Sequence, residues 1–237
     1  PWRTFDEGAI GSICCLYPLE LFNGTFQAAE KTVHAIKDQF VDTRGFYHPL
    51  IHSGYNAYLT LQLAHCYLNM GDTARAWQIA ESIFKQASPT DNYPEAIHPM
   101  TGGGSMGDGH HGWAAAEVIL FLRDLLVKER GDVLQLLHGA ELLFNAQKRL
   151  SVSDLPTDFG TLSFSIEPES INSSTFRFSH KFFPTNKPKI LELHLPFIAA
   201  KIMPAVPSHL LAKEFVEKKT ILKLSPEVTT LFFQFNR

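Results

Sequence analysis

Along the first half of the chain, apolar residues recur every three or four positions, as they do on one face of an α-helix. The pattern predicts five helices, at residues 10–21, 26–40, 53–70, 73–86 and 113–129. Thr25 and Ser53 stand where a side chain can cap the second and third helices. The short connection at residues 69–72 predicts that the third and fourth helices form an antiparallel hairpin.

Beyond about residue 150 the sequence changes to runs of β-branched and aromatic residues separated by Pro, Asn and Ser. Four of these runs predict strands, at residues 161–167, 175–178, 190–195 and 230–235. Residues 207–219, with Ser208 as a cap, predict a short helix, and residues 132–150 favour neither state. Because helices come first and strands afterwards, we expect a mainly α fold, with a helical unit over residues 1–150 and a smaller β-rich, sandwich-like unit over residues 151–237.

Composition narrows the possible partners. The 237 residues are 45% hydrophobic and carry a net charge of -3, as in an ordinary globular protein. No block of basic residues provides a footprint for nucleic acid, and no apolar run has the length of a membrane span. We therefore expect neither nucleic acid nor a membrane as a partner. The three cysteines, Cys14, Cys15 and Cys66, cannot all pair within the chain, which favours a reducing compartment such as the cytoplasm.

Residues 93–113 form the segment that is richest in candidate chemistry. This glycine-rich stretch between two predicted helices gathers carboxylates, histidines and an aromatic residue, and such loops often carry function. Glu95 lies between Pro94 and Pro99, which restrict its backbone, and a rigid ionised carboxylate is what a general base requires. The alternative is a surface glutamate in a turn.

Further candidates surround this carboxylate. Trp113 can stack on a sugar ring or anchor the core, and Glu117 lies one helical turn further along the same predicted helix. Asp108 can point into a cleft or stabilise the start of that helix. The expected substrate-binding residues are Trp113, Tyr55, His98, Asp108, His111 and Glu117.

The same segment favours neither a metal nor a cofactor. His110 and His111 are adjacent and diverge, and no ligand stands at the helical spacing that a zinc motif uses. The glycine-rich loop also lacks the lysine and the preceding strand of a nucleotide-binding loop. We expect no bound cofactor.

The order of several short motifs resembles the second half of an (α/α)6 toroid, or six-hairpin, glycoside hydrolase of the glucoamylase and glucodextranase group. The motifs lie between residue 4 and about residue 128, at Thr4–Glu7, Ser53–Tyr55, Gly71–Ala76, Pro94–Ala96 and Gly112–Glu117. The resemblance implies that Glu95 is the catalytic base of an inverting mechanism and that Trp113 belongs to the second motif of the group. Ala96 departs from the group, which has Gln or Glu at that position.

The resemblance also implies an incomplete catalytic pair. The general acid of the group lies upstream of the matching segment, so we expect this chain to be a carboxy-terminal half that is inactive alone and partners a missing amino-terminal half. The leading hypothesis is therefore a glycoside hydrolase segment that acts on a carbohydrate substrate. One alternative is a disaccharide phosphorylase that binds phosphate at the glycine-rich loop through Ser105. Another is a helical-repeat interaction module, because residues 58–86 are similar to a tetratricopeptide unit.

Overall fold

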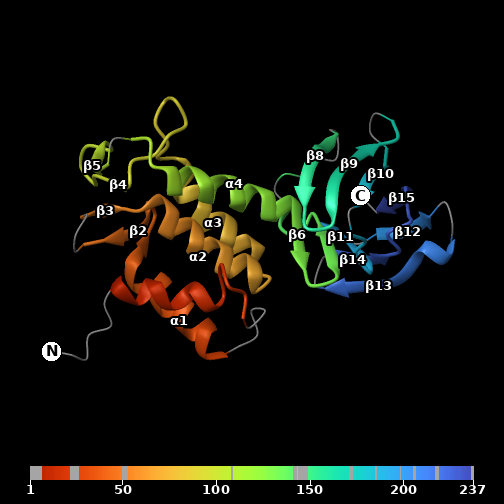
Figure 1. Cartoon of the computed structure of the whole chain (residues 1–237), viewed down its shortest axis with the longest axis horizontal. Helices are drawn as coiled ribbons and strands as arrows, with labels where there is room; N and C mark the ends of the chain where they lie inside the picture. The colour runs from red at the N-terminus through yellow and green to blue at the C-terminus, as the bar shows by residue number, and fades with distance from the viewer. Residues whose placement is uncertain are drawn as a thin grey trace. The chain divides into compact units, whose positions relative to one another are not determined.

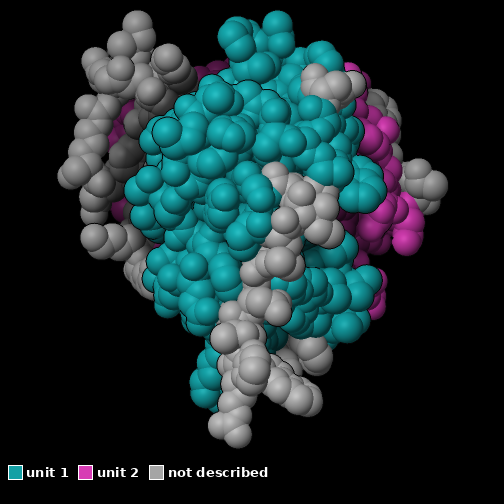
Figure 2. Space-filling view, turned by 90° about the vertical axis from the view of Figure 1, so that its left-hand side faces the viewer, with its two compact units in different colours: residues 1–122 teal, residues 123–237 magenta. Residues whose placement is uncertain are grey.

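The chain divides into two compact units, residues 1–122 (unit 1) and residues 123–237 (unit 2), which are coloured teal and magenta in Figure 2. The computed structural model describes residues 7–21, 27–49, 53–107, 109–140, 143, 149–170, 173–184, 186–197, 199–204, 207–216 and 219–235.

Unit 1 combines helices with a small antiparallel sheet (Figure 1). Its helices are the 3-10 helix η1 (Glu7–Cys15) and the α-helices α1 (Gln27–Phe40), α2 (Ala57–Asn69), α3 (Thr73–Phe84) and α4 (Gly112–Leu126), the last of which runs past the unit boundary. Its sheet has the order β1 (Val41–Asp42), β2 (Gly45–His48), β3 (Gly54–Tyr55), β4 (Ala96–Ile97) and β5 (Gly104–Met106). β3 leads directly into α2, so the sheet lies where that helix begins (Figure 1).

Helix α2 is the centre of unit 1. It buries side chains around its whole circumference and packs against η1, α1 and α3, as expected for a helix without a solvent face. By contrast, α1 is amphipathic and buries one stripe, formed by Ala29, Val33 and Ile36. The helices predicted at residues 26–40 and 73–86 are thus confirmed within one or two residues at each end.

The start of α2 differs from the prediction. Its cap is Asn56, whose side-chain Oδ1 accepts a hydrogen bond from the backbone N–H of Leu59 at 3.0 Å. Ser53 instead has a φ of 40° and lies before β3, so it cannot cap the helix. The other predicted cap, Thr25, lies outside the described residues.

Unit 2 is built from two five-stranded sheets. One has the order β12 (Ala199–Pro204), β15 (Thr230–Phe235), β10 (Thr175–Pro184), β9 (Gly160–Pro168) and β8 (Leu150–Thr157). The other has the order β13 (Leu210–Val216), β14 (Lys219–Leu224), β11 (Ile190–Leu195), β7 (Val133–Leu136) and β6 (Val127–Arg130), and β7 and β11 are its parallel pair. The short 3-10 helix η3 (Pro207–His209) precedes β13.

The two sheets of unit 2 share one core. Phe164, Phe178 and Phe233 come from one sheet, Leu193 and Leu222 come from the other, and all five belong to a single buried cluster. Inner faces that contribute to one core are the arrangement of a β-sandwich. The β-rich, sandwich-like unit expected in the second part of the chain is therefore present, and the four predicted strands fall within β9, β10, β11 and β15.

The predicted fold class is nevertheless wrong. Three five-stranded sheets mean that the chain is not mainly α. An (α/α)6 toroid needs twelve helices, whereas the described part of the chain contains four α-helices and two short 3-10 helices. The toroid and six-hairpin assignment is therefore wrong as well.

Two further differences explain much of this error. Residues 127–129, predicted to end the last helix, belong to β6 because they pair with β7. Residues 210–216, predicted as helical, form β13 because they pair with β14. In both places pairing with the next strand of the chain overrides the local helical pattern. Since β7 also pairs with β11, unit 2 begins before residue 150.

Among the described residues, no helix has both the length and the apolar character required to cross a membrane.

Candidate functional site

The glycine-rich segment folds into an ordered hairpin. β4 pairs with β5, and the backbone N–H of His98 donates to the carbonyl of Gly103 at 2.7 Å. The Nδ1 atom of His98 accepts from the backbone N–H groups of Met100 and Thr101, at 3.1 and 3.2 Å, so its ring closes the turn. Ser105, which the phosphorylase hypothesis assigns to phosphate, donates its hydroxyl to the carbonyl of Ala96.

Glu95 lies just before this hairpin and is held on two sides. Its backbone carbonyl accepts a hydrogen bond from Asn56 Nδ2 at 3.0 Å, which ties it to the start of α2. Gly107, with φ of 76°, packs on its other side, where an added Cβ would lie 3.1 Å from the Glu95 nitrogen. Because of this close contact and the positive φ, a larger residue at position 107 would displace the Glu95 backbone.

The carboxylate of Glu95 faces His111. Glu95 Oε2 is 3.9 Å from His111 Nε2, and the two side chains are 20% and 18% exposed. The backbone N–H of His111 donates to the carbonyl of Tyr93 at 2.9 Å, which aligns the segment before α4 with the segment before β4. The structure thus brings together two residues that are 16 positions apart and leaves about a fifth of each side chain exposed.

Three rings extend this pair into a small aromatic cluster. The Tyr58 ring lies 5.3 Å from the His111 ring and 5.6 Å from the Trp113 ring, and His111 and Trp113 are also 5.6 Å apart. Trp113 is 67% exposed, which excludes the alternative that it anchors the core. Burial raises the pKa of the Tyr58 phenol, and the charge of Glu95 raises it further. We call Tyr58, Glu95, His111 and Trp113 the Glu95 cluster.

This arrangement has the features of a site for a ring-shaped ligand that has an apolar face and carries hydroxyl groups. An exposed indole offers an apolar face, while a carboxylate and an imidazole beside it can hydrogen-bond to hydroxyl groups. Tyr58 was not predicted as a site residue, although it belongs to the polar-aromatic segment before and within α2.

Tyr55 belongs to a different group of residues. Its hydroxyl donates to Asp42 Oδ2 at 2.5 Å, and the Arg44 guanidinium lies 4.4 Å above its ring. Burial, followed by the hydrogen bond with Asp42, raises the pKa of Tyr55 to about 12. With Tyr47 and Pro99, these residues line a pocket of about 520 Å³.

Glu117 also lies in a separate environment. It is 9% exposed, and its two carboxylate oxygens accept hydrogen bonds from Tyr17 Oη and Gln62 Nε2, each at 3.0 Å. The His65 ring stacks on Tyr17 with centroids 3.8 Å apart and places Nε2 3.6 Å from Glu117 Oε2. These contacts make Glu117 part of a buried polar network that links the turn after η1 with α2 and α4. The network was not predicted, because its members are up to 100 positions apart.

The remaining predicted site residue, Asp108, lies outside the described residues. Within the part of the chain that is described, no group of three or more His, Cys, Asp or Glu side chains could hold a metal ion.

No known protein family matches this chain, and no curated protein matches it either. The assignment to the glucoamylase and glucodextranase group, inferred from short motifs, therefore has no support from a family match and conflicts with the observed fold.

Proposed function

We propose that unit 1 binds a carbohydrate at the Glu95 cluster and that Glu95 serves as the general base in hydrolysis of a glycosidic bond. The observation that carries this proposal is that His111 lies next to both a partly exposed carboxylate, Glu95, and a highly exposed indole, Trp113. The indole provides a stacking surface for the apolar face of a sugar ring, and the carboxylate can accept a proton from a water molecule.

The support for Glu95 as the base is its fixed backbone. The hydrogen bond from Asn56 and the close packing of Gly107 hold the residue from two directions. His111 lies within 3.9 Å of the carboxylate and can orient it. A base held in this way loses little entropy when it aligns a water molecule for attack.

An inverting reaction also needs a general acid, with the two carboxyl groups about 6.5–9.5 Å apart. Both oxygens of Glu117 accept hydrogen bonds in a buried network, so we do not assign the acid to this residue. In this proposal the acid comes from outside the described residues.

The test is a substitution that keeps the shape of the side chain and removes the base. Glu95→Gln should lower kcat for glycoside hydrolysis at least about 100-fold, since general bases commonly contribute 10²–10⁴-fold. Sugar binding should be retained. Activity is measured with the chain joined to any sequence that its gene encodes before Pro1.

The matched control is Glu81→Gln on α3. Glu81 is exposed and pairs with Lys85 at 3.0 Å, so its substitution removes one carboxylate of the same unit without touching the Glu95 cluster. Unchanged turnover in Glu95→Gln would exclude Glu95 as the base. Absence of sugar binding in the unsubstituted chain would exclude the carbohydrate site itself.

A further inference from the structure

The outer face of sheet β8-β9-β10 in unit 2 is unusually rich in hydroxyl groups. Along β9, Leu162, Phe164 and Ile166 are buried in the core of the sandwich. Since side chains alternate between the two faces of a strand, Ser163 and Ser165 lie on the opposite, outer face.

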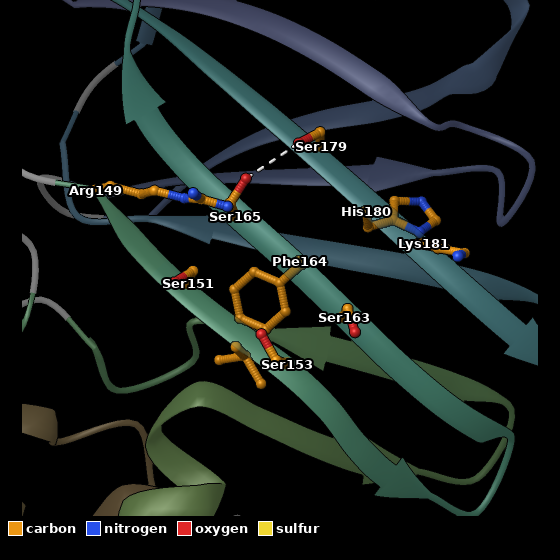
Figure 3. Close-up of a pocket in the computed structure, with 10 residues that line it drawn as sticks. Arg149, Ser151, Ser153, Ser163, Phe164, Ser165, Ser179, His180 and Lys181 are labelled. Carbon is orange, nitrogen blue, oxygen red and sulfur yellow. Dashed lines mark hydrogen bonds between the residues drawn. The ribbon is translucent and has the colours of Figure 1, made fainter.

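Serines from the three strands are aligned across this face. Ser165 on β9 is in register with Ser151 on β8 and with Ser179 on β10. The hydroxyls of Ser165 and Ser179 are 3.1 Å apart and joined by a hydrogen bond (Figure 3). Ser153 adds a further hydroxyl to the same surface, whereas the Ser163 hydroxyl donates to Asp154 Oδ1 at 3.2 Å. A serine hydroxyl can rotate to donate to a ligand, so the exposed Ser151 and Ser153 and the half-buried Ser179 can present donors at once, whereas Ser165 is only 6% exposed.

These serines line a shallow pocket of about 240 Å³ (Figure 3). Its charged lining residues are Arg149, which extends across β8 and β9 in this view, and Lys181 on β10. The described lining includes no carboxylate. Two carboxylates lie beside lining residues. Asp154 Oδ1 is 3.2 Å from Ser163 Oγ, and Glu167 Oε2 is 3.5 Å from Arg149 Nε, although the Arg149 side chain is 62% exposed. His180 adds no positive charge at neutral pH, because burial lowers its pKa.

The size and lining of the pocket select one class of ligand. Drug-sized ligands occupy pockets of roughly 300–1,000 Å³, so this smaller pocket fits a compact group. Phe164, which also lines the pocket, is buried in the core and offers no exposed ring for a sugar to stack on. Two cations together with hydroxyl donors match the oxygens of a tetrahedral anion.

We propose that this pocket binds a small tetrahedral oxyanion, phosphate or sulfate, either as a free ion or as an ester group of a larger molecule. The site is in unit 2 and does not depend on the carbohydrate site proposed for unit 1. Arg149 and Lys181 hold the charge of the anion from two sides, and the serine row donates hydrogen bonds to its oxygens.

The test measures binding of sodium phosphate and sodium sulfate to the whole chain by calorimetry, at constant ionic strength set with sodium chloride. The double substitution Arg149→Gln and Lys181→Gln should weaken binding at least about tenfold, because it removes both charge-assisted partners. Lys181→Arg should bind like the unsubstituted chain. Lys187→Gln is the matched control, since Lys187 is an exposed lysine of the same unit that pairs with Glu227.

A second set of titrations distinguishes the source of the anion. Glucose 6-phosphate that binds more tightly than inorganic phosphate would identify an ester group of a larger molecule as the ligand, and equal or weaker binding would identify the free ion. The proposal is overturned if neither phosphate nor sulfate binds at about 10 mM, far above the range of a specific site. It is also overturned if the double variant, with an unchanged circular dichroism spectrum, binds as well as Lys187→Gln.

Discussion

Asn56 links the start of α2 to the position of Glu95, and its two hydrogen bonds can be separated by substitution. Its Oδ1 accepts from the Leu59 backbone at 3.0 Å, and its Nδ2 donates to the Glu95 carbonyl at 3.0 Å. The side chain is fully buried. Asn56→Ser retains an oxygen that can cap the helix and removes the donor to Glu95, whereas Asn56→Ala removes both interactions.

The expected losses follow from these two interactions. A buried carbonyl left without its donor costs about 1–3 kcal/mol, so Asn56→Ser should lower the free energy of unfolding of unit 1 by that amount. Loss of the helix cap costs a further ~1 kcal/mol, so Asn56→Ala should lose about 2–4 kcal/mol in total. Asn56→Ser should also reduce hydrolysis, because Glu95 loses one of its two backbone supports.

The assay is urea unfolding followed by tryptophan fluorescence. Trp2, Trp77 and Trp113 are the three tryptophans of the chain, and all lie in unit 1, so the signal reports that unit. Asn186→Ser, an exposed change in unit 2, should leave the transition within about 0.5 kcal/mol of the unsubstituted chain. Equal stability of the unsubstituted chain, Asn56→Ser and Asn56→Ala would refute the reasoning, and equal losses in both variants would show that the cap contributes nothing.

Two pH dependences follow from shifted pKa values. Tyr55 has its pKa raised from 10.0 to about 12, so the stability that it contributes is present below pH 10 and is lost as the pH rises toward 12. Tyr55→Phe should therefore flatten the alkaline loss of stability seen by tryptophan fluorescence, and an unchanged slope would contradict this. In unit 2, the hydrogen bond with His194 and then that from Gln135 lower the pKa of Glu192 from 4.5 to about 2. Its contribution is present above pH 4.5 and lost as the pH falls toward 2, so Glu192→Gln should reduce the acid sensitivity of hydrogen exchange in β11, whereas equal sensitivity in both proteins would count against the assignment.

The local sequence pattern gives the correct secondary structure for those elements whose spatial neighbours favour the same state. Helix α1 buries one stripe at helical spacing, and β11 and β15 alternate or cluster β-forming residues, so each was recognised. The segment at residues 210–216 contains good helix formers, and only its pairing with β14 makes it a strand. The toroid was inferred from the order of short motifs, and the sheet at the start of α2 together with the two sheets of unit 2 shows that those motifs do not determine the architecture.

The candidate site could also be predicted in part, where residue type within one segment was enough to identify its members. Glu95 and His111 were both recognised from residue type in one segment, and the structure places them side by side. Trp113 and Glu117 lie one helical turn apart, yet the indole is exposed while the carboxylate is buried against Tyr17. Helical spacing gives the direction of a side chain and not what covers it, so the contact with a residue 100 positions away could not be inferred.

The most direct test of the carbohydrate site uses Trp113 as its own reporter. Saccharides are titrated into the unsubstituted chain, Trp113→Ala and Glu95→Gln, and binding is followed by tryptophan fluorescence and by calorimetry. We predict saturable binding to the unsubstituted chain and to Glu95→Gln, with affinity about tenfold weaker in Trp113→Ala, since stacking on an aromatic ring contributes up to about 1.5 kcal/mol. Binding that is absent from all three proteins, or unaffected by removal of the Trp113 indole, would contradict the account.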